Sequence, residues 1–290
     1  MGCSEVPLRR NRRGQTVSAR SRRNSFAGKR AGESKRKSSF KEEIMDVPER
    51  LIRKLLEAQS VVVLTGAGIS AESGVPTFRG DDGLWKKFRP EELANFDAFI
   101  RNPDLVWEWY QYRRKLICEV QPNPGHYALA EMEKLFPQFL LVTQNVDGLH
   151  RRAGSEKIVE LHGNILRNRC IQCNAFYTDL NWQEGEKVPH CPKCGGLIRP
   201  DVVWFGELLP PEAMEKAEEA AKQCDVFFSV GTSAVVYPAA SLPGVALQHG
   251  AFIAEINPEP TPVSQIAHVV IREKSGIALP EILKRLKEAK

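Results

Sequence analysis

The stretch VVVLTGAGISAESG, residues 61–74, decides the fold of this protein. Its first four residues are apolar and mostly β-branched, which predicts a buried β-strand. The strand runs directly into a turn in which Gly66 and Gly68 allow a tight backbone and the close approach of a ligand. Ala71 stands where a third small residue would pack the following helix against the strand, and Ser70 is a candidate cap for that helix.

A strand, a small-residue turn and a helix N-terminus are together typical of a pyrophosphate site, although a plain tight turn has the same composition. A standard dinucleotide fold also has an acidic residue at the end of a second strand about 20 residues further on. Residues 75–85 instead read VPTFRGDDGLW, which predicts a loop. We therefore expect that a dinucleotide bound here has its ribose held differently, and a dehydrogenase is disfavoured.

Length and charge narrow the class of protein. The 290 residues suffice for one large domain or two small ones, and 42% of them are hydrophobic, enough for a core. No apolar run approaches the length of about 18 residues that crosses a membrane. Residues 1–40 carry a net charge of +10 and the whole chain +5, so residues 41–290 carry −5. The basic character belongs to the tail, so we expect no nucleic-acid binding by the body.

Residues 1–45 are predicted to be a disordered basic tail, because they are rich in Arg, Lys and Ser and poor in apolar residues. Such a tail can be merely solvated, can be a transit peptide, or can contact nucleic acid or acidic surfaces. Acylation of Gly2 is disfavoured, since Val6 stands where the myristoylation pattern has Ser or Thr. We expect a cytoplasmic protein, or a mitochondrial one if the tail is a transit peptide.

Four of the seven cysteines form two C-x-x-C pairs separated by 17 residues. This spacing is typical of a four-cysteine zinc ribbon, and without a secretory signal metal binding is favoured over disulfides. Four thiolates close the tetrahedral shell of Zn²⁺, so the ion would be structural rather than catalytic. The neighbouring His190 would be a fifth ligand and is expected to be a bystander. The predicted ligands are Cys170, Cys173, Cys191 and Cys194.

The remaining sequence alternates predicted strands and helices, which indicates an α/β fold with a parallel sheet covered by helices on both faces. The zinc ribbon interrupts this series as an inserted module. The predicted strands are 61–64, 139–143, 158–161, 226–230, 252–256 and 268–271, and the predicted helices are 48–58, 91–120, 123–136, 212–222 and 280–288.

Small and polar residues follow several of these strands, at 66–70, 144–147 and 231–233. Open α/β sheets bind ligands at the carboxyl ends of their strands, so these segments are expected to meet. His162 also leaves a strand, beside a glycine. A lone histidine is more often structural, but this position makes His162 a candidate for catalysis.

Tyr110 and Arg113 lie three residues apart in a predicted helix and therefore share a face. An arginine beside a tyrosine on a pocket wall can clamp a carboxylate through paired hydrogen bonds. The spacing alone fits equally well with a helix that packs an aromatic face, because Trp107, Trp109 and Tyr112 are close by.

Taken together, these motifs resemble the sirtuin family of NAD-dependent protein-lysine deacylases, in a form like the bacterial and archaeal members. The resemblance covers about residues 47–290 and rests on GAGIS (66–70), PTFR (76–79), QNVD (144–147), LHG (161–163), the cysteine pairs, VVWFG (202–206) and GTS (231–233). It implies a Rossmann-like core, approximately residues 46–77, 122–166 and 200–290, and a small domain made of a helical part, 78–121, and the zinc ribbon, 167–199.

The resemblance also implies roles for single residues. His162 and Asn145 would be catalytic, with His162 as the general base that takes a proton from a ribose hydroxyl. The peptide backbone of the substrate would pair with Val203, Phe205 and Gly206 as an added strand. The residues implied for NAD are Gly66, Ala67, Gly68, Ile69, Ser70, Ala71, Phe78, Arg79, Trp85, Gln144, Asn145, Asp147, Gly231, Thr232, Ser233, Asn257 and Ser275.

Within the sirtuin family a Tyr-x-x-Arg pair marks members that remove succinyl or malonyl groups, and Tyr110 and Arg113 match it. Arg113 would meet the acyl carboxylate, and Tyr110 would donate a hydrogen bond to it; Arg114 competes for the same role. The implied activity is a deacetylase and desuccinylase or demalonylase that releases nicotinamide, O-acyl-ADP-ribose and free lysine. The partners would be acyl-lysine proteins, and the chain a monomer. The alternatives are a protein mono-ADP-ribosyltransferase and a zinc-ribbon nucleic-acid module.

Overall fold

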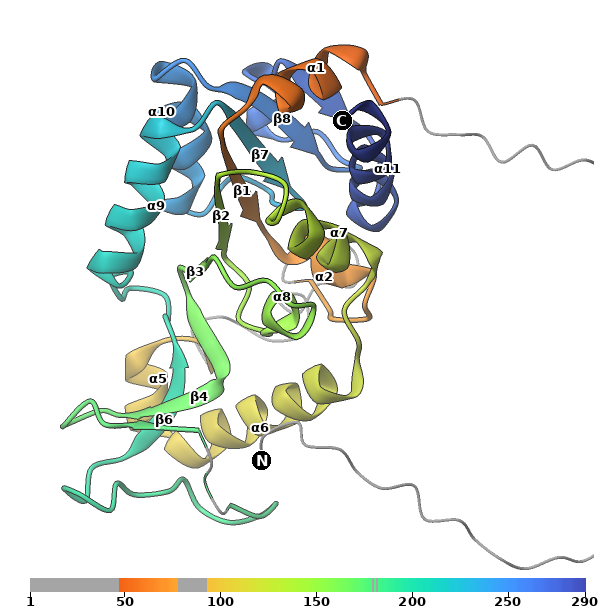
Figure 1. Cartoon of the computed structure of the whole chain (residues 1–290). Coiled ribbons are helices and arrows are strands. Elements are labelled where there is room, and N and C mark those ends of the chain that lie inside the picture. The colour runs from red at the N-terminus through yellow and green to blue at the C-terminus, as the bar shows by residue number, and fades with distance from the viewer. Residues whose placement is uncertain (1–46, 78–92, 179, 181) are drawn as a thin grey trace, which may run out of the picture. The chain divides into compact units, whose positions relative to one another are not determined.

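A computed structural model of the chain describes residues 47–77, 93–178, 180 and 182–290 (Figure 1). The predicted basic tail and the residues Phe78, Arg79 and Trp85 lie outside the described residues. No helix among the described residues is long and apolar enough to cross a membrane.

Six parallel strands form the central sheet, as the alternation of the sequence predicts. Their order is β3-β2-β1-β7-β8-β9, so the chain starts in the middle, builds one edge, and then returns to build the other. The strands are β1 (Ser60–Thr65), β2 (Gln138–Thr143), β3 (Ile158–Glu160), β7 (Val226–Val230), β8 (Phe252–Ile256) and β9 (Val269–Ile271).

The pleat of the sheet divides the core into two layers. Val61 and Val63 of β1 pack with α1 (Glu49–Glu57), α7 (Pro124–Met132) and α11 (Ser275–Ala289). Val62 and Leu64 face the other way, toward α9 (Pro211–Gln223) and α10 (Leu242–Gln248). Figure 1 shows the two sets of helices on opposite sides of the sheet. A strand that is buried on both faces must be apolar throughout, as β1 is.

A second, antiparallel sheet carries the cysteine pairs. It has the order β5-β4-β6, with β4 (Gly163–Cys170), β5 (Phe176–Tyr177) and β6 (Ile198–Val202). A third hydrophobic cluster joins this sheet to α5 (Phe96–Arg101) and α6 (Pro103–Glu119) through Phe99, Trp107 and Trp204. Together these elements form a smaller layer beside the parallel sheet (Figure 1). The remaining short elements are α2 (Ala67–Ala71), α8 (Leu149–Arg152), η1 (Ala239–Ser241) and η2 (Pro262–Gln265).

Several element boundaries differ from the prediction. The expected helix over 91–120 is two helices, because Asn102 caps α6 through the N–H of Leu105 and Pro103 begins the new helix. The expected helix over 280–288 begins at Ser275, with Pro280 inside it; burial of Ala278 and Leu279 against the neighbouring helices offsets the lost hydrogen bond. Helix α10 was not predicted.

The start of the helix that follows β1 also differs from the prediction. Gly66 is the N-cap of α2, and Ser70 lies inside this helix, so Ser70 does not cap it. The reason is that the helix begins within the glycine turn itself, four residues earlier than a serine cap would require. Ala71 is exposed and does not pack the helix against the strand. The contact expected of Ala71 is made by the fully buried Ile69.

The core predicts a strong response to truncation at β7. Replacing Phe228, which is fully buried, by alanine removes a ring from the layer beneath α7 and α11. We expect Phe228→Ala to lower the free energy of unfolding by about 3–5 kcal/mol, measured by urea unfolding. Phe176→Ala is the control, because this ring is exposed in β5. It should lower the free energy of unfolding by about 0.5 kcal/mol. Equal costs would contradict the assignment of this core.

Candidate active site

Two glycines in the turn after β1 bring this turn against the end of the neighbouring strand β7. A Cβ atom at Gly66 would lie 2.7 Å from the Cα of Thr232, and one at Gly68 would lie 2.7 Å from the carbonyl oxygen of Gly231. Real Cβ atoms do not approach so closely, so neither position accepts a side chain. The N–H of Gly68 donates to the carbonyl of Gly231 over 2.7 Å. The glycine turn therefore lies flat on the end of β7.

The strand ends enclose a cavity of about 540 Å³. It opens where the carboxyl ends of parallel strands meet, the usual ligand position in such sheets. Fifteen of the predicted site residues line it: Gly66, Ala67, Gly68, Tyr110, Arg113, Gln144, Asn145, His162, Val203, Phe205, Gly206, Gly231, Thr232, Ser233 and Asn257.

Side-chain amides fix the polar residues of this rim to one another. The amide of Gln144 donates to the hydroxyl of Thr232 over 3.0 Å, and that of Asn257 donates to the carbonyl of Thr232 over 2.9 Å. The amide of Asn145 donates to the carbonyl of Gly66 over 3.0 Å. The ends of four strands, β1, β2, β7 and β8, are thereby joined around one opening.

Of the predicted cofactor residues that the structure describes, five do not line the cavity: Ile69, Ser70, Ala71, Asp147 and Ser275. Ser70 and Asp147 are buried beneath it, where the hydroxyl of Ser70 donates to the carboxylate of Asp147 over 2.8 Å. Ser275 belongs to the packing of α11, since its hydroxyl donates to Glu72 and its carbonyl faces Gly125 of α7.

Below this layer lie two buried histidines, His126 and His150, with ring centroids 4.8 Å apart. Burial lowers the pKa of His126 to about 4 and that of His150 well below its ordinary value, so both rings are neutral. His126 Nδ1 accepts the N–H of Asn123, which assigns its proton to Nε2. Neutral rings that are fully enclosed support the floor of the cavity rather than exchange protons with solvent.

His162 is the histidine that lines the cavity. Its Nδ1 lies 2.9 Å from the carbonyl oxygen of Gln144. A carbonyl only accepts hydrogen bonds, so Nδ1 carries the proton and Nε2 is left as the basic nitrogen. Burial lowers the pKa of His162, and the bond to Gln144 opposes this shift. The ring is therefore a neutral base with one assigned tautomer.

The backbone around His162 is equally constrained. Gly163 has φ +80°, and a Cβ there would lie 2.1 Å from the carbonyl oxygen of Asp201. The carbonyl of His162 accepts the N–H of Val203 over 2.9 Å. His162 is thus joined directly to the segment predicted to bind a peptide. In that segment the N–H of Phe205 is also occupied, by the carbonyl of Ala94.

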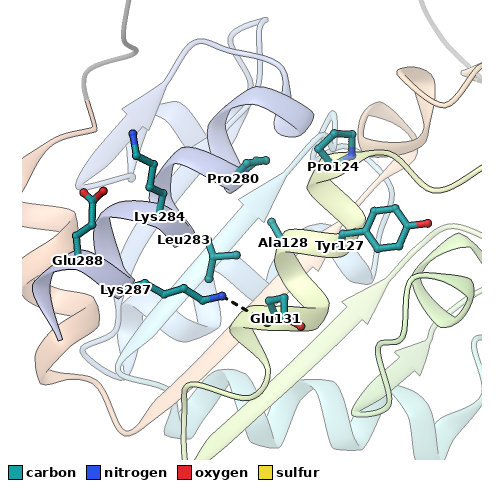
Figure 2. A pocket seen from close by; sticks show the side chains of 9 residues that line it. All are labelled: Pro124, Tyr127, Ala128, Glu131, Pro280, Leu283, Lys284, Lys287 and Glu288. Atoms are coloured by element: carbon teal, nitrogen blue, oxygen red, sulfur yellow. Dashed lines mark hydrogen bonds and ion pairs between the residues drawn. The ribbon is translucent and has the colours of Figure 1, made fainter.

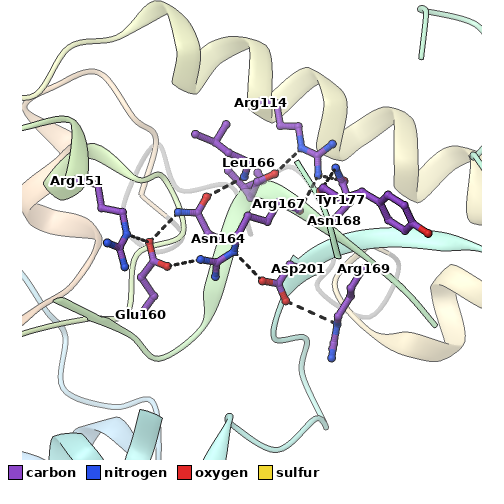
Figure 3. Close-up of polar contacts among 11 residues, drawn as sticks. Arg114, Arg151, Glu160, Asn164, Leu166, Arg167, Asn168, Arg169, Tyr177 and Asp201 are labelled. Carbon is purple, nitrogen blue, oxygen red and sulfur yellow. Dashed lines mark hydrogen bonds and ion pairs between the residues drawn. The ribbon is translucent and has the colours of Figure 1, made fainter. Parts of the chain in front are cut away.

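Ion pairs among residues that do not line the cavity bracket this turn (Figure 3). Glu160 accepts from Asn164 over 2.8 Å and pairs with Arg167 over 2.9 Å and with Arg151 over 3.3 Å. Arg167 also pairs with Asp201 of β6 over 3.0 Å. The network ties the end of β3 to both long strands of the small sheet, and so fixes the loop that carries the base.

Tyr110 and Arg113 line the cavity from α6, and both are buried. Burial raises the pKa of Tyr110, so its hydroxyl keeps its proton, while the guanidinium of Arg113 stays charged despite a pKa that burial lowers. Arg114 points elsewhere: it donates to the carbonyls of Ile165 and Arg167 in β4 and lies 5.3 Å from the Trp107 ring centroid. Arg114 therefore serves packing, and the competition expected from the sequence does not arise.

The four predicted cysteine ligands converge in the small sheet. All four sulfur atoms lie within 4.8 Å of one another, with 3.5 Å between Cys170 and Cys194 and 3.6 Å between Cys173 and Cys191. Zinc–sulfur bonds of about 2.3 Å in a tetrahedron place sulfurs about 3.8 Å apart, so the cluster fits zinc. His190 stays outside it, bonded through Nδ1 to the carbonyl of Gly195.

A second hollow, of about 650 Å³, lies between α7 and α11 (Figure 2). It is open and largely apolar, and the Lys287–Glu131 ion pair of 3.4 Å crosses it. Among the residues that the structure describes, no histidine or cysteine lines it, so they offer no imidazole or thiol there. Its lining residues are Pro124, Tyr127, Ala128, Glu131, Pro280, Leu283, Lys284, Lys287 and Glu288.

Trp204, Glu207, Tyr237 and Thr77 also line the main cavity but were not predicted as site residues. Trp204 could have been found from its position, because it lies between Val203 and Phe205, both of which were predicted. Tyr237 and Thr77 lie in irregular segments whose path no periodic pattern indicates.

A parallel sheet with a cavity at its glycine-lined strand ends, beside a four-cysteine sheet, defines the class of dinucleotide-binding α/β proteins with a zinc-ribbon module. The family model described as the Sir2 family matches residues 66–238. The chain belongs to this family, whose members are the sirtuins. The resemblance seen in the sequence and the predicted fold class are both confirmed.

Individual relatives agree with this assignment. The NAD-dependent protein deacylase of Aquifex aeolicus is 55% identical over 233 residues, which is 80% of this chain and 98% of that protein. NAD-dependent protein deacylase 1 of Archaeoglobus fulgidus is 47% identical over 241 residues, 83% of this chain and 98% of that protein. Among solved structures, a complex of a Sir2 homologue with NAD has a TM-score of 0.80 at 46% identity, covering 84% of this chain and 96% of that one.

A Sir2 structure containing a deacetylated p53 peptide and 3'-O-acetyl ADP-ribose has a TM-score of 0.72 at 34% identity, covering 83% of this chain and 97% of that one.

The cysteine cluster leads to a test of metal content. We expect one zinc ion per chain, and Cys194→Ser should lose it and lower Tm, because three thiolates no longer close the shell. Cys224→Ala is the matched control, since this thiol is buried between α9 and the parallel sheet, outside the cluster. Zinc is measured by atomic emission and Tm by calorimetry. Full zinc content in Cys194→Ser would rule out the four-thiolate site.

Proposed function

We propose that this protein is an NAD-dependent protein-lysine deacylase, with NAD as co-substrate and one structural zinc ion. The observation that carries the proposal is the neutral imidazole of His162 on the wall of a cavity made by four strand ends. The names of the relatives support deacylation over transfer of ADP-ribose to a protein acceptor. NAD supplies the ADP-ribose unit that accepts the acyl group, and the products are nicotinamide, O-acyl-ADP-ribose and free lysine.

Different residues of the cavity bind different parts of NAD. The backbone of Gly66, Ala67 and Gly68 offers a surface without side chains on which a pyrophosphate fits closely. Gly231, Thr232, Ser233 and Asn257 face the adenosine half. Asn145 and Gln144 face the nicotinamide riboside, close to His162.

His162 acts as the general base of the reaction. Its Nε2 is unprotonated because Gln144 holds the proton on Nδ1, and burial keeps the ring neutral at physiological pH. A neutral imidazole near a ribose hydroxyl can accept the proton that this hydroxyl loses as it attacks. The hydrogen bond from the N–H of Val203 to the carbonyl of His162 supports a position of the base next to the peptide.

The peptide substrate lies along Val203, Phe205 and Gly206. The N–H groups of Val203 and Phe205 donate to the carbonyls of His162 and Ala94, which fixes the segment as an extended edge for the peptide. The acyl-lysine enters the cavity toward Tyr110 and Arg113. A charged guanidinium beside a tyrosine hydroxyl suits an acyl group that ends in a carboxylate, so succinyl and malonyl groups are substrates as well as acetyl.

Removing the base should nearly abolish turnover. General-base catalysis contributes about 10²–10⁴-fold, so His162→Tyr is expected to lose at least about 100-fold in deacylation. The readout is nicotinamide and O-acyl-ADP-ribose formed from NAD and an acetyl-lysine peptide, by mass spectrometry. For the unchanged chain kcat/KM should rise with pH through a midpoint below the ordinary histidine value of 6.5, because burial favours the neutral ring. A midpoint above that value would contradict His162 as the base.

Arg113→Met tests the acyl preference. A bidentate, charge-assisted contact is worth about 3 kcal/mol, so the ratio of desuccinylation to deacetylation should fall about 100-fold. Arg114→Met is the matched control, because its guanidinium is bound to β4 and should leave the ratio unchanged. Both ratios come from kcat/KM with paired succinyl- and acetyl-lysine peptides. A loss shared equally by both acyl groups in Arg113→Met would exclude the carboxylate contact while leaving deacylation itself intact.

A further inference from the structure

Trp204 connects the peptide segment to the acyl end of the cavity. Its ring is 2% exposed and lies between α6 and the end of β6. The ring centroids of Phe99 and Tyr110 are 5.3 Å and 6.2 Å from its own. Trp204 also lines the cavity that holds Tyr110 and Arg113. The indole is therefore in place to act on the acyl pocket from the side.

The polarity of one hydrogen bond is fixed by chemistry. The indole Nε1–H of Trp204 lies 2.8 Å from the hydroxyl oxygen of Tyr110. An indole nitrogen only donates, so the tyrosine oxygen must accept this bond. The phenolic proton of Tyr110 consequently cannot point at Trp204. It points away from the indole, where the hydroxyl can donate to another acceptor. The bond thus sets the orientation of the hydroxyl as a donor.

Trp204 is held rigidly by an arginine and a carboxylate. The guanidinium of Arg199, which is buried, lies 3.3 Å from the Trp204 ring centroid. Arg199 pairs with both carboxylate oxygens of Glu207 and donates to the carbonyl of Val202 over 2.7 Å. Glu207 in turn accepts the backbone N–H of Trp204 over 2.8 Å. Ring and backbone are both fixed, so the indole N–H keeps its direction.

On this basis we propose that Trp204 is a specificity-positioning residue, which orients the hydroxyl of Tyr110 as a hydrogen-bond donor to acyl groups that carry a carboxylate. The proposal rests on the proposed deacylase function and on the Tyr110–Arg113 pocket. Trp204 acts through Tyr110. An acetyl group has no carboxylate to receive this proton, so the effect separates acyl groups from one another.

The test compares acyl groups within one variant. Trp204→Phe keeps an aromatic ring and removes the N–H donor together with the rest of the five-membered ring of the indole. The ratio of desuccinylation to deacetylation, from kcat/KM, is expected to fall about 3- to 10-fold, the value of one hydrogen bond. Phe99→Leu is the matched control, because it disturbs the packing around Trp204 without touching the hydrogen bond; it should lower both activities together. An unchanged ratio in folded Trp204→Phe overturns the proposal.

A second measurement shows whether Trp204 acts through Tyr110. In a Tyr110→Phe background the hydroxyl is absent, so adding Trp204→Phe should not lower the ratio further. If Trp204→Phe lowers the ratio by the same factor in both backgrounds, the proposed route through Tyr110 is wrong. If Tyr110→Phe and Arg113→Met both leave the ratio unchanged, the acyl pocket of the proposed function fails instead, and the two failures are distinguishable.

Zinc content and Tm show whether each variant is folded. Should Trp204→Phe not fold, Glu207→Gln replaces it, because loss of the ion pair frees the Arg199 guanidinium that holds the indole. The ratio should then fall about 3-fold, less than on removal of the N–H itself. An unchanged ratio in a folded Glu207→Gln protein overturns the role of this support.

Discussion

The structure depends on a contact between backbones that leaves no room for side chains. Gly66 and Gly68 lie directly on Gly231 and Thr232. A Cβ atom at either glycine would lie 2.7 Å from an atom of the segment that follows β7. This closeness lets two strand ends of a parallel sheet form one continuous polar surface. Larger residues would push the turn away from β7 and open the floor of the cavity. The amides of Gln144, Asn145 and Asn257 then only need to span short, fixed gaps.

The layers beneath the cavity show how polar groups are retained in a buried floor. Ser70, Asp147 and Asn145 are bonded to one another, and His150 bonds to Thr65 over 3.0 Å. Buried polar groups cost free energy unless they are paired, so such a network confines each side chain to few arrangements. Residues that line the cavity are thus positioned by others, such as Ser70 and Asp147, that do not line it. This explains why Ser70 and Asp147 belong to the motifs without lining the cavity.

Local sequence patterns predict much of the fold and of the site, whereas features that depend on contacts between distant segments could not be predicted. The apolar run before Gly66, the cysteine spacing and the histidine leaving a strand are local patterns with one dominant structural meaning. The role of Trp204 depends on contacts with Tyr110 and Arg199, which no spacing indicates. Arg114 and Arg113 are equivalent candidates in the sequence. They differ in the structure because Arg114 donates to carbonyls of β4, whereas Arg113 lines the cavity. The start of α11 was missed because Pro280 resembles a first helical residue, whereas burial decides where that helix begins.

The small sheet links the cysteine cluster to the chemistry of the cavity. Strands β4 and β6 pair at Gly163–Val202 at one end and at Cys170–Ile198 at the other, with a shift of register between Asn164 and Asn168. Cys170 ends β4, and Cys194 lies just before β6, so a zinc ion bound by the cluster closes the far end of the strand pair. The near end carries His162 before β4 and Val203 after β6, joined by a hydrogen bond of 2.9 Å. The cysteine end and the His162 end of this strand pair therefore have separate registers, divided by the shift between Asn164 and Asn168. A zinc ion bound by the cluster would brace the small sheet as a whole, while the ion pairs of Glu160, Arg167 and Asp201 fix the turn at His162 locally.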